Sequence, residues 1–379
     1  MKITSLLRNA LSLSIGFCAL APALVAAEPV KVGEFACLTG KDATFGQSQH
    51  KGIQLALEEI NAAGGVLDRQ VELLTEDNQS KPGESATVAK KLLSRDKVVA
   101  ILGEVTSGRS LEVAPLAQMS KIPMVATGAT NPKVTQTGSY IFRVCFIDDF
   151  QGTVMAKFAK DDLKARKVAL LTSVSSAYSV GLSKYFKETF VAGGGEIVAE
   201  QKFNEGDKDF RAQLTAIKAA NADAVFVPGY YTEAALVARQ ARALGLDIPL
   251  FGGDGWESEK LLEIGGDALN GCYYSTHFTP ENKDPGVAEF VKKFKARWDG
   301  ETPDAYAALG YDALYVLVDA IKRSGGTDGA KLREALATTR NFSGASGVTT
   351  IDKDRNAQKP ATIIAIQGGK TVFHKTVAP

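Results

Sequence analysis

Short apolar runs alternate with longer stretches of helical periodicity along most of this chain. Residues 30–36 form a valine-containing apolar run that predicts a β-strand, and residues 46–63 place Ile53, Leu57 and Ile60 on one face of a helix. A glycine pair at 64–65 ends that helix, since glycine commonly follows the last helical turn. By the same criteria, further strands are predicted over 70–75, 98–102 and 122–125, separated by helices over 82–94 and 108–120.

A second series of the same kind begins at residue 167. It predicts strands over 167–172, 196–200, 224–227 and 249–251, and helices over 179–192, 209–219 and 233–244. Alternation of strands with helices is the order expected of parallel sheets covered by helices. Because the two series are of similar size and meet near residues 143–150, the sequence predicts two lobes, each an open doubly wound α/β sheet.

The residues from 285 onward are too few to form a third domain. They predict helices over 287–298, 305–323 and 329–338, and strands over 348–351, 361–366 and 371–374. Residues 352–356 begin like a calcium-binding loop, but Ala357 and Ile363 occupy the positions that require glycine and glutamate. We therefore predict a hairpin turn there, and expect the whole segment to complete the two lobes.

The first 27 residues have the layout of a cleavable secretory signal. Lys2 and Arg8 precede an apolar run over 10–21, and small residues follow up to Ala27. A membrane anchor is the alternative, but the run is shorter than the roughly 20 residues that a spanning helix needs. Cys18 follows a bulky residue, which disfavours lipid attachment. We expect cleavage after Ala27 or, alternatively, Ala26, and a mature protein that is free in the exported compartment.

The charge balance of the mature chain narrows the choice of partner. The chain has 44 basic and 43 acidic residues, and loss of Lys2 and Arg8 leaves 42 basic residues against 43 acidic ones, a net charge of about −1. Such balance argues against nucleic acid as a partner. Cys37, Cys145 and Cys272 remain after cleavage, and although export permits one disulfide, we expect three buried thiols, because free cysteine is among the most buried residue types.

Small and hydroxylic residues follow two strands of the first lobe. Thr106 and Ser107 come after the strand at 98–102, and Gly128 and Thr130 come after the strand at 122–125. In open α/β sheets ligands bind at such strand ends, and the free N–H groups of a helix start suit a carboxylate. The simpler alternative is that Thr106 or Ser107 only caps the following helix.

The matching strand ends of the second lobe carry three tyrosines and an acid. Tyr178, Tyr230 and Tyr231 follow two of the strands, and Asp254 lies between glycines after a third. An acid flanked by glycines can approach a ligand ammonium closely. The alternatives are a turn role for Asp254 and core packing for the tyrosines.

Enzyme functions have little support in the sequence. The chain has three histidines, and it contains no GxSxG, Walker GxxxxGK, HExxH or complete GxGxxG motif. We therefore expect a binding protein that has no catalytic residues and needs no metal or cofactor.

Several segments together resemble a known family over essentially the whole mature chain. They include GIQLALEEINAAGG at 52–65, GATNP at 128–132, RQARALG at 239–245 and YAALGYDA at 306–313. In these segments the chain is similar to the leucine/isoleucine/valine-binding proteins, which are periplasmic components of ABC importers with the type I periplasmic-binding fold. The resemblance implies a small amino acid ligand, branched-chain or otherwise aliphatic, and the membrane subunits of an importer as partner. We expect a monomer.

The resemblance also implies a role for each candidate residue. In the family a hydroxyl and backbone groups hold the ligand carboxylate, and these match Ser107, Gly128 and Thr130, with Thr106 beside them. The acid that binds the ammonium matches Asp254, where many members carry glutamate. Aromatic contacts match Phe45, Tyr178, Tyr230 and Tyr306. A disulfide found in some members cannot form here, because the matching positions are Ser80 and Thr106.

Three crossovers between the lobes follow from the resemblance, near 145–149, 275–278 and 343–347. They assign residues 28–146 and 277–344 to the first lobe and residues 147–276 and 345–379 to the second. The implied mechanism is hinge closure over the ligand. Alternatives that stay open are an amide, urea or aromatic acid as ligand, and a ligand-sensing role for a signalling partner.

Overall fold

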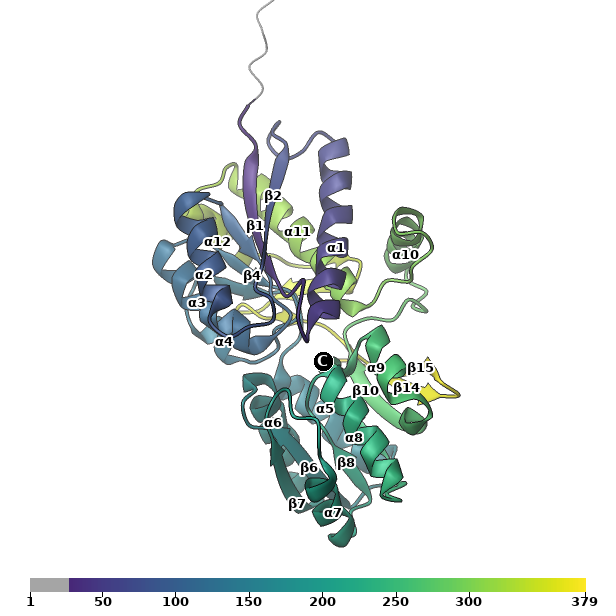
Figure 1. Cartoon of the computed structure of the whole chain (residues 1–379). Coiled ribbons are helices and arrows are strands. Elements are labelled where there is room, and N and C mark those ends of the chain that lie inside the picture. The colour runs from purple at the N-terminus through teal and green to yellow at the C-terminus, as the bar shows by residue number, and fades with distance from the viewer. Residues whose placement is uncertain (1–26) are drawn as a thin grey trace, which may run out of the picture.

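Two α/β lobes lie one above the other in the computed structural model (Figure 1). The model describes residues 27–379, so the expected signal segment lies outside the described residues except for Ala27. The arrangement confirms the fold class predicted from the alternation of strands and helices. Within residues 27–379, no helix combines the length and apolarity that crossing a bilayer requires.

The first lobe is built on a five-stranded sheet with the order β2-β1-β3-β4-β5, in which every pairing is parallel. Its strands are β1 (Val30–Ala36), β2 (Val71–Asp77), β3 (Ala100–Leu102), β4 (Met124–Ala126) and β5 (Ile141–Arg143). The helices packed on this lobe are α1 (Ala43–Ala62), α2 (Glu84–Lys90), α3 (Ser107–Ser120), α4 (Lys133–Gln136), α10 (Pro285–Arg297), α11 (Ala305–Ser324) and α12 (Gly329–Ala337). A π-helical turn at Lys91–Arg95 extends α2.

The second lobe contains a seven-stranded sheet with the order β15-β14-β10-β9-β8-β6-β7. Its strands are β6 (Lys167–Ser173), β7 (Glu196–Phe203), β8 (Ala224–Phe226), β9 (Leu250–Gly252), β10 (Cys272–Thr276), β14 (Ala361–Gln367) and β15 (Lys370–Val377). β14 and β15 run antiparallel to their neighbours, whereas the other pairings are parallel. The helices are α5 (Asp148–Asp161), α6 (Ala177–Ala192), α7 (Arg211–Ala219), α8 (Tyr231–Ala243) and α9 (Glu259–Gly265), with short 3₁₀ turns at Asp254–Trp256 and Gly266–Leu269.

All the predicted strands and helices are present, and the elements that were missed include α4, α9 and three others, β5, β10 and α5. β5 has only three residues, too few to show a period. β10 has the sequence CYYST, which is not an apolar run. α5 begins with two aspartates where the sequence analysis predicts a connection between the lobes. Each of the three lies next to a passage of the chain between the lobes.

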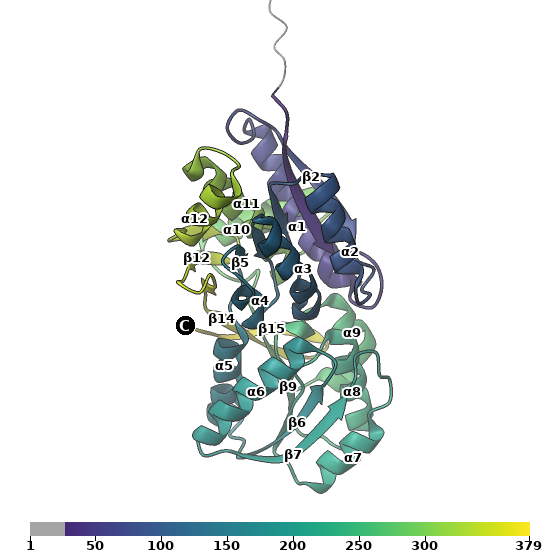
Figure 2. The same ribbon diagram turned by 90° about the vertical axis from the view of Figure 1, so that its left-hand side faces the viewer.

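The chain passes between the two sheets three times, after β5, after β10 and before β14. The small sheet of β11 (Phe342–Gly344), β12 (Gly347–Ile351) and β13 (Ala357–Gln358) precedes the third passage. In Figure 2, β12 lies beside β5 in the upper lobe, and the Arg143 N–H donates to the Arg355 carbonyl at 3.2 Å. The sequence analysis expects the third crossover near 343–347, but these contacts lead us to propose it between β13 and β14.

Two smaller predictions are also confirmed. Cys37, Cys145 and Cys272 are buried and free of disulfides among the residues that the structure describes. Residues 352–356 form the turn of the β12–β13 hairpin, closed by the Asp352 N–H donating to the Asn356 carbonyl at 2.8 Å.

Glycine allows α1 and α11 to cross at close range. A Cβ atom added at Gly52 would overlap the carbonyl oxygen of Ala307, and one added at Gly310 would overlap that of Gln49. α11 is buried along most of its length. Its N-terminus is capped by Asp304, whose side chain accepts the Ala307 N–H at 2.9 Å. The crossing therefore fixes the helix whose first residues reach the junction between the lobes.

Replacing Gly52 with alanine should destabilise the protein, because the added methyl group must push α1 away from α11. We expect a free energy of unfolding lower by about 1–3 kcal/mol, measured by urea denaturation. Gly326→Ala is the control, since a Cβ atom there meets nothing within 4 Å. Equal stability of the two variants would show that the crossing has room for a side chain.

Candidate functional site

The loops at the strand ends of the two lobes touch each other across the junction. The Tyr231 hydroxyl of the second lobe donates to the carbonyl of Lys41 in the first lobe at 2.7 Å. The Tyr306 hydroxyl of the first lobe donates to the carbonyl of Asp254 in the second lobe, also at 2.7 Å. The lobes are therefore closed on one another, and the contact runs through the loops that the sequence analysis singled out.

Aromatic rings from both lobes gather around Phe45. Its ring centroid lies 5.0 Å from that of Tyr306, 5.0 Å from that of Tyr231 and 5.6 Å from that of Tyr230, all in edge-on arrangements. Tyr178 stacks on Tyr230 at 5.5 Å with nearly parallel planes. The structure thus brings together all four aromatic residues predicted for the site, and Tyr231 joins them.

Asp254 is buried in the same junction, and its carboxylate is held by two side chains. Gln151 Nε2 donates to Oδ1 at 2.9 Å, and His277 Nε2 lies 3.1 Å from Oδ2. Burial lowers the pKa of His277, so the neutral ring donates from Nε2. Asp254 also begins a 3₁₀ turn, so it has the turn role that the sequence analysis gives as the alternative.

Glycines on either side of Asp254 let Tyr178 approach the turn. A Cβ atom at Gly253 would overlap the Tyr178 hydroxyl oxygen, and the Gly255 N–H donates to that oxygen at 3.2 Å. Burial raises the pKa of Tyr178 well above its usual range, with the Asp254 charge adding to the rise. The tyrosine therefore stays protonated.

The loops after β3 and β4 in the first lobe are tied to each other. Ser107 Oγ accepts the Asn131 N–H at 3.1 Å. Gly128 has no room for a side chain, since a Cβ atom would lie 2.9 Å from Tyr306 Cε1. Thr130 is 1% exposed, and its hydroxyl has no hydrogen-bond partner among residues 27–379.

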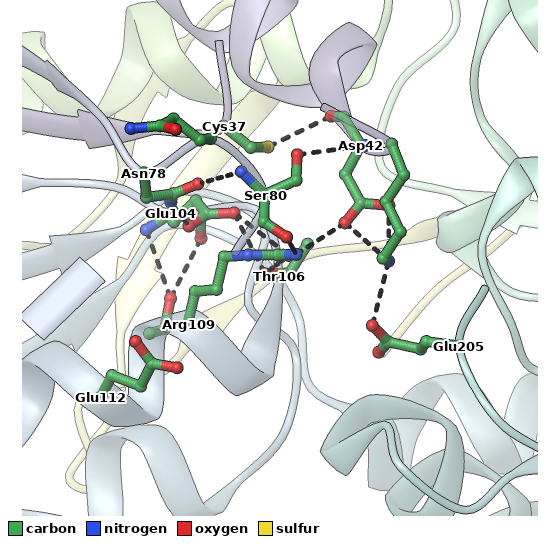
Figure 3. A network of polar contacts seen from close by, with 12 residues as sticks. Cys37, Asp42, Asn78, Ser80, Glu104, Thr106, Arg109, Glu112 and Glu205 are labelled. Carbon is green, nitrogen blue, oxygen red and sulfur yellow. Dashed lines mark hydrogen bonds and ion pairs between the residues drawn. The ribbon is translucent and has the colours of Figure 1, made fainter. Parts of the chain in front are cut away.

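The Thr106 hydroxyl is engaged in a buried polar network rather than in capping α3 (Figure 3). It donates to Glu104 Oε1 at 3.0 Å and accepts from Arg109 Nη1 at 2.9 Å. Arg109 Nη2 donates to the Ser80 carbonyl at 2.8 Å and lies 2.9 Å from Asp42 Oδ2. Arg109 therefore links positions 80 and 106, the two positions that the family resemblance matches to a disulfide of some members.

Lys41 extends this network across the junction. Its ammonium lies 2.8 Å from Asp42 Oδ2 in its own lobe and 3.0 Å from Glu205 Oε2 in the other. It also lies over the Tyr230 ring, 5.4 Å from the centroid. The Lys41–Glu205 pair joins the loop after β1 to the loop after β7, where Figure 3 labels Glu205, so it forms only when the lobes are closed.

The functional contacts that sequence reasoning missed are Gln151, His277, Arg109 and Lys41. Gln151 lies on α5, which was not predicted, and His277 was counted only as one of three histidines. Arg109 and Lys41 stand beside candidate loops but form no motif. The sequence could have indicated these four residues only if it had also predicted which loops contact each other.

A second concave feature lies beside this site. A groove of about 350 Å³ runs between the N-terminal half of α1, residues 278–281 and the β14–β15 hairpin. None of the nine predicted site residues lines it. The groove is therefore distinct from the junction described above.

Glu104 should give the protein a pH-dependent stability. Burial raises the pKa of its carboxyl to about 7, against the lowering effect of Arg109 and the Thr106 hydroxyl. Between the ordinary glutamate pKa and this value the folded state binds more protons than the unfolded chain, so this residue makes the protein less stable as pH rises.

Glu104→Gln removes that contribution. We expect the unfolding free energy of the variant, relative to wild type, to increase between pH 4.5 and pH 8 by about 1–3 kcal/mol, measured by urea denaturation at both pH values. A difference that stays constant over this range would contradict the prediction.

Comparison with known proteins gives a consistent picture. Residues 29–370 match the family model described as periplasmic binding protein. The chain is 30% identical over 363 residues to "Leu/Ile/Val-binding protein homolog 3" of Brucella melitensis biotype 1, covering 95% of this chain and 96% of the relative.

Two solved structures share the whole fold. The crystal structure of a leucine binding protein, LivK, from Thermotoga maritima MSB8 is 42% identical with a TM-score of 0.89, covering 92% of this chain and 99% of the other. The branched-chain amino acid transporter substrate-binding protein LivJ from Streptococcus pneumoniae, solved with isoleucine, is 34% identical with a TM-score of 0.87, covering 93% and 100%.

The fold and the facing strand ends define a two-lobed extracytoplasmic binding protein. The chain belongs to the periplasmic binding protein family, among the Leu/Ile/Val-binding proteins that serve as substrate-binding components of ABC transporters. This is a family of transport proteins rather than of enzymes.

Proposed function

We propose that this protein captures a small aliphatic amino acid between its lobes and delivers it to the membrane subunits of an ABC importer. The observation that carries the proposal is Asp254, a buried acid on the second lobe. Its backbone carbonyl accepts from Tyr306, which lies against Gly128 of the first lobe, and the neighbouring first-lobe loop offers the Ser107 hydroxyl and the helix start of α3. An anionic group on one side and donors on the other match the two charges of an amino acid zwitterion.

In this proposal Ser107 and the backbone of Gly128 and Thr130 hold the carboxylate, and Asp254 holds the ammonium. Phe45, Tyr178, Tyr230 and Tyr306 exclude water from both charges, and Thr106 supports the loop through Glu104 and Arg109. Pairing is needed because a buried charge without a partner costs several kcal/mol.

The first test is thermal unfolding of ligand-free mature protein with single amino acids, amides, urea and aromatic acids. A ligand that binds only the folded state raises the midpoint, and we expect leucine, isoleucine or valine to do so most strongly. Asp254→Ala should weaken this binding by about 100-fold or more, since removing one partner of a buried pair costs roughly 3–5 kcal/mol.

Asp209→Ala serves as the matched control, because Asp209 is an exposed second-lobe acid whose ion-pair partner is Arg211. It should bind like wild type. Stabilisation only by ligands that lack an amine would contradict the role of Asp254 and favour an amide, urea or aromatic acid as the ligand.

The Lys41–Glu205 pair should slow ligand release, because it stabilises only the closed state. Lys41→Met should raise the dissociation rate by roughly 2–5-fold, as expected for a partly exposed ion pair of about 0.5–1 kcal/mol. The dissociation rate is measured by stopped-flow fluorescence while the bound ligand is displaced from the protein. Lys51→Met is the control, since the Lys51–Glu301 pair has a similarly exposed lysine but lies within the first lobe. Equal rates in both variants would exclude an interlobe role for Lys41.

A further inference from the structure

A second acid, Asp148, is buried close to the proposed site and has no assigned role. It is the first residue of α5 and is fully buried. Within residues 27–379 neither of its carboxylate oxygens has a hydrogen-bond partner, and the residue forms no ion pair. Buried polar atoms are nearly always satisfied, so an orphaned carboxylate indicates a group that joins it in another state of the protein.

Asp148 lies against the loop that carries Thr130. The Asp148 N–H donates to the Thr130 carbonyl at 3.0 Å, and the two side chains are close enough for the Thr130 hydroxyl to lower the pKa of the carboxyl. Neither side chain is fully satisfied, since Thr130 Oγ1 also lacks a partner with good geometry among the described residues. On the other side, a Cβ atom at Gly181 of α6 would lie 3.1 Å from Asp148 Oδ2. The missing side chain at Gly181 leaves room for the carboxylate.

The two buried acids differ in what surrounds them. Both oxygens of Asp254 already have protein partners, Gln151 and His277, whereas those of Asp148 have none in the described part of the chain. Asp254 therefore has protein partners for both oxygens in the empty cleft. Asp148 needs either a proton or a positive charge nearby.

We propose that Asp148 is a positioning residue for the ligand amine: its carboxylate accepts the hydroxyl proton of Thr130 and so turns the Thr130 lone pairs toward the ammonium. A hydroxyl has one proton and two lone pairs, so a threonine that donates to Asp148 can only accept from the ligand. The inference rests on the proposed function, because it needs a ligand that carries an amine. It adds a second acid that acts on the amine through Thr130.

Binding should then be coupled to release of a proton. Burial raises the pKa of Asp148 well above its usual range, the Asp254 and Asp149 charges add to the rise, and Thr130 and Arg143 oppose it. Cys145, Tyr178 and Tyr185 are the other titratable groups that face it. In the empty protein Asp148 therefore keeps its proton, and the arriving ammonium favours the ionised form, so the proton leaves to solvent. Affinity should rise with pH until the empty protein has lost that proton.

Isothermal titration calorimetry at pH 7 in two buffers of different ionisation enthalpy measures the proton count. The probe is L-leucine, or the amino acid that stabilises the wild type most. We expect wild type to release up to one proton per ligand. Asp148→Asn should release none and bind at least 10-fold more weakly, because an amide cannot ionise.

Asp161→Asn is the matched control, since it removes an exposed acid from the other end of α5 that does not act on the pKa of Asp148. It should keep the affinity and the proton release of wild type. Thr130→Val should weaken binding, and Asp148→Asn added to it should have little further effect, because the acid acts through that hydroxyl.

Wild-type affinity and an unchanged proton count in Asp148→Asn would overturn the proposal. If that variant does not fold, Thr130→Val decides, and normal affinity with normal proton release there overturns the proposal as well. In either case, amino acid binding by the wild type would still support the proposed function. If the wild type binds only ligands without an amine, both the proposed function and the positioning role of Asp148 are wrong.

Discussion

Burial of charge where two lobes close is the constraint on which this structure depends. Ionisable side chains lose water at the junction, and each then needs a partner there. Arg109 meets Asp42, and Asp254 meets Gln151 and His277. Lys359, buried in the segment between β13 and β14, lies 3.4 Å from Asp312. Apolar packing alone would allow the lobes to slide, whereas the Lys41–Glu205 pair and the hydrogen bonds of the Tyr231 and Tyr306 hydroxyls across the junction are satisfied in only one relative position.

The polar network around Arg109 shows that two first-lobe loops can be linked without a disulfide. The family resemblance implies a disulfide between two first-lobe loops in some members, and this chain has Ser80 and Thr106 at the matching positions. A guanidinium presents several donors in a rigid plane, so Arg109 reaches the Ser80 carbonyl and the Thr106 hydroxyl at once. The link does not depend on the redox state of the compartment. It also orients Asp42, and through Asp42 the lysine that spans the junction.

The two buried acids near the proposed site illustrate how environment separates roles. Carboxylates of equal chemistry differ in ionisation when one has donors around it and the other does not. Asp254 has two side-chain partners, so we assign it the direct contact with the ligand ammonium. Asp148 has none among the described residues, so we assign it a charge that appears only with the ligand. Closure, pairing and proton release are then parts of one equilibrium.

The sequence by itself determined the strands, the helices and the loops that follow them, because these depend on periodicity and turn chemistry within a few residues. It also indicated Asp254, Ser107 and the aromatic residues, since each stands at a strand end or in a family motif. It missed β5, β10 and α5, which are short or begin with polar residues beside the crossings.

Only the tertiary structure decided which side chains act together. Gln151 and Asp254 are 103 positions apart, and Thr135 and Asn356 are 221 apart. The partner of a buried charge is chosen by the path of the chain between the lobes, and that path leaves no local pattern in the sequence.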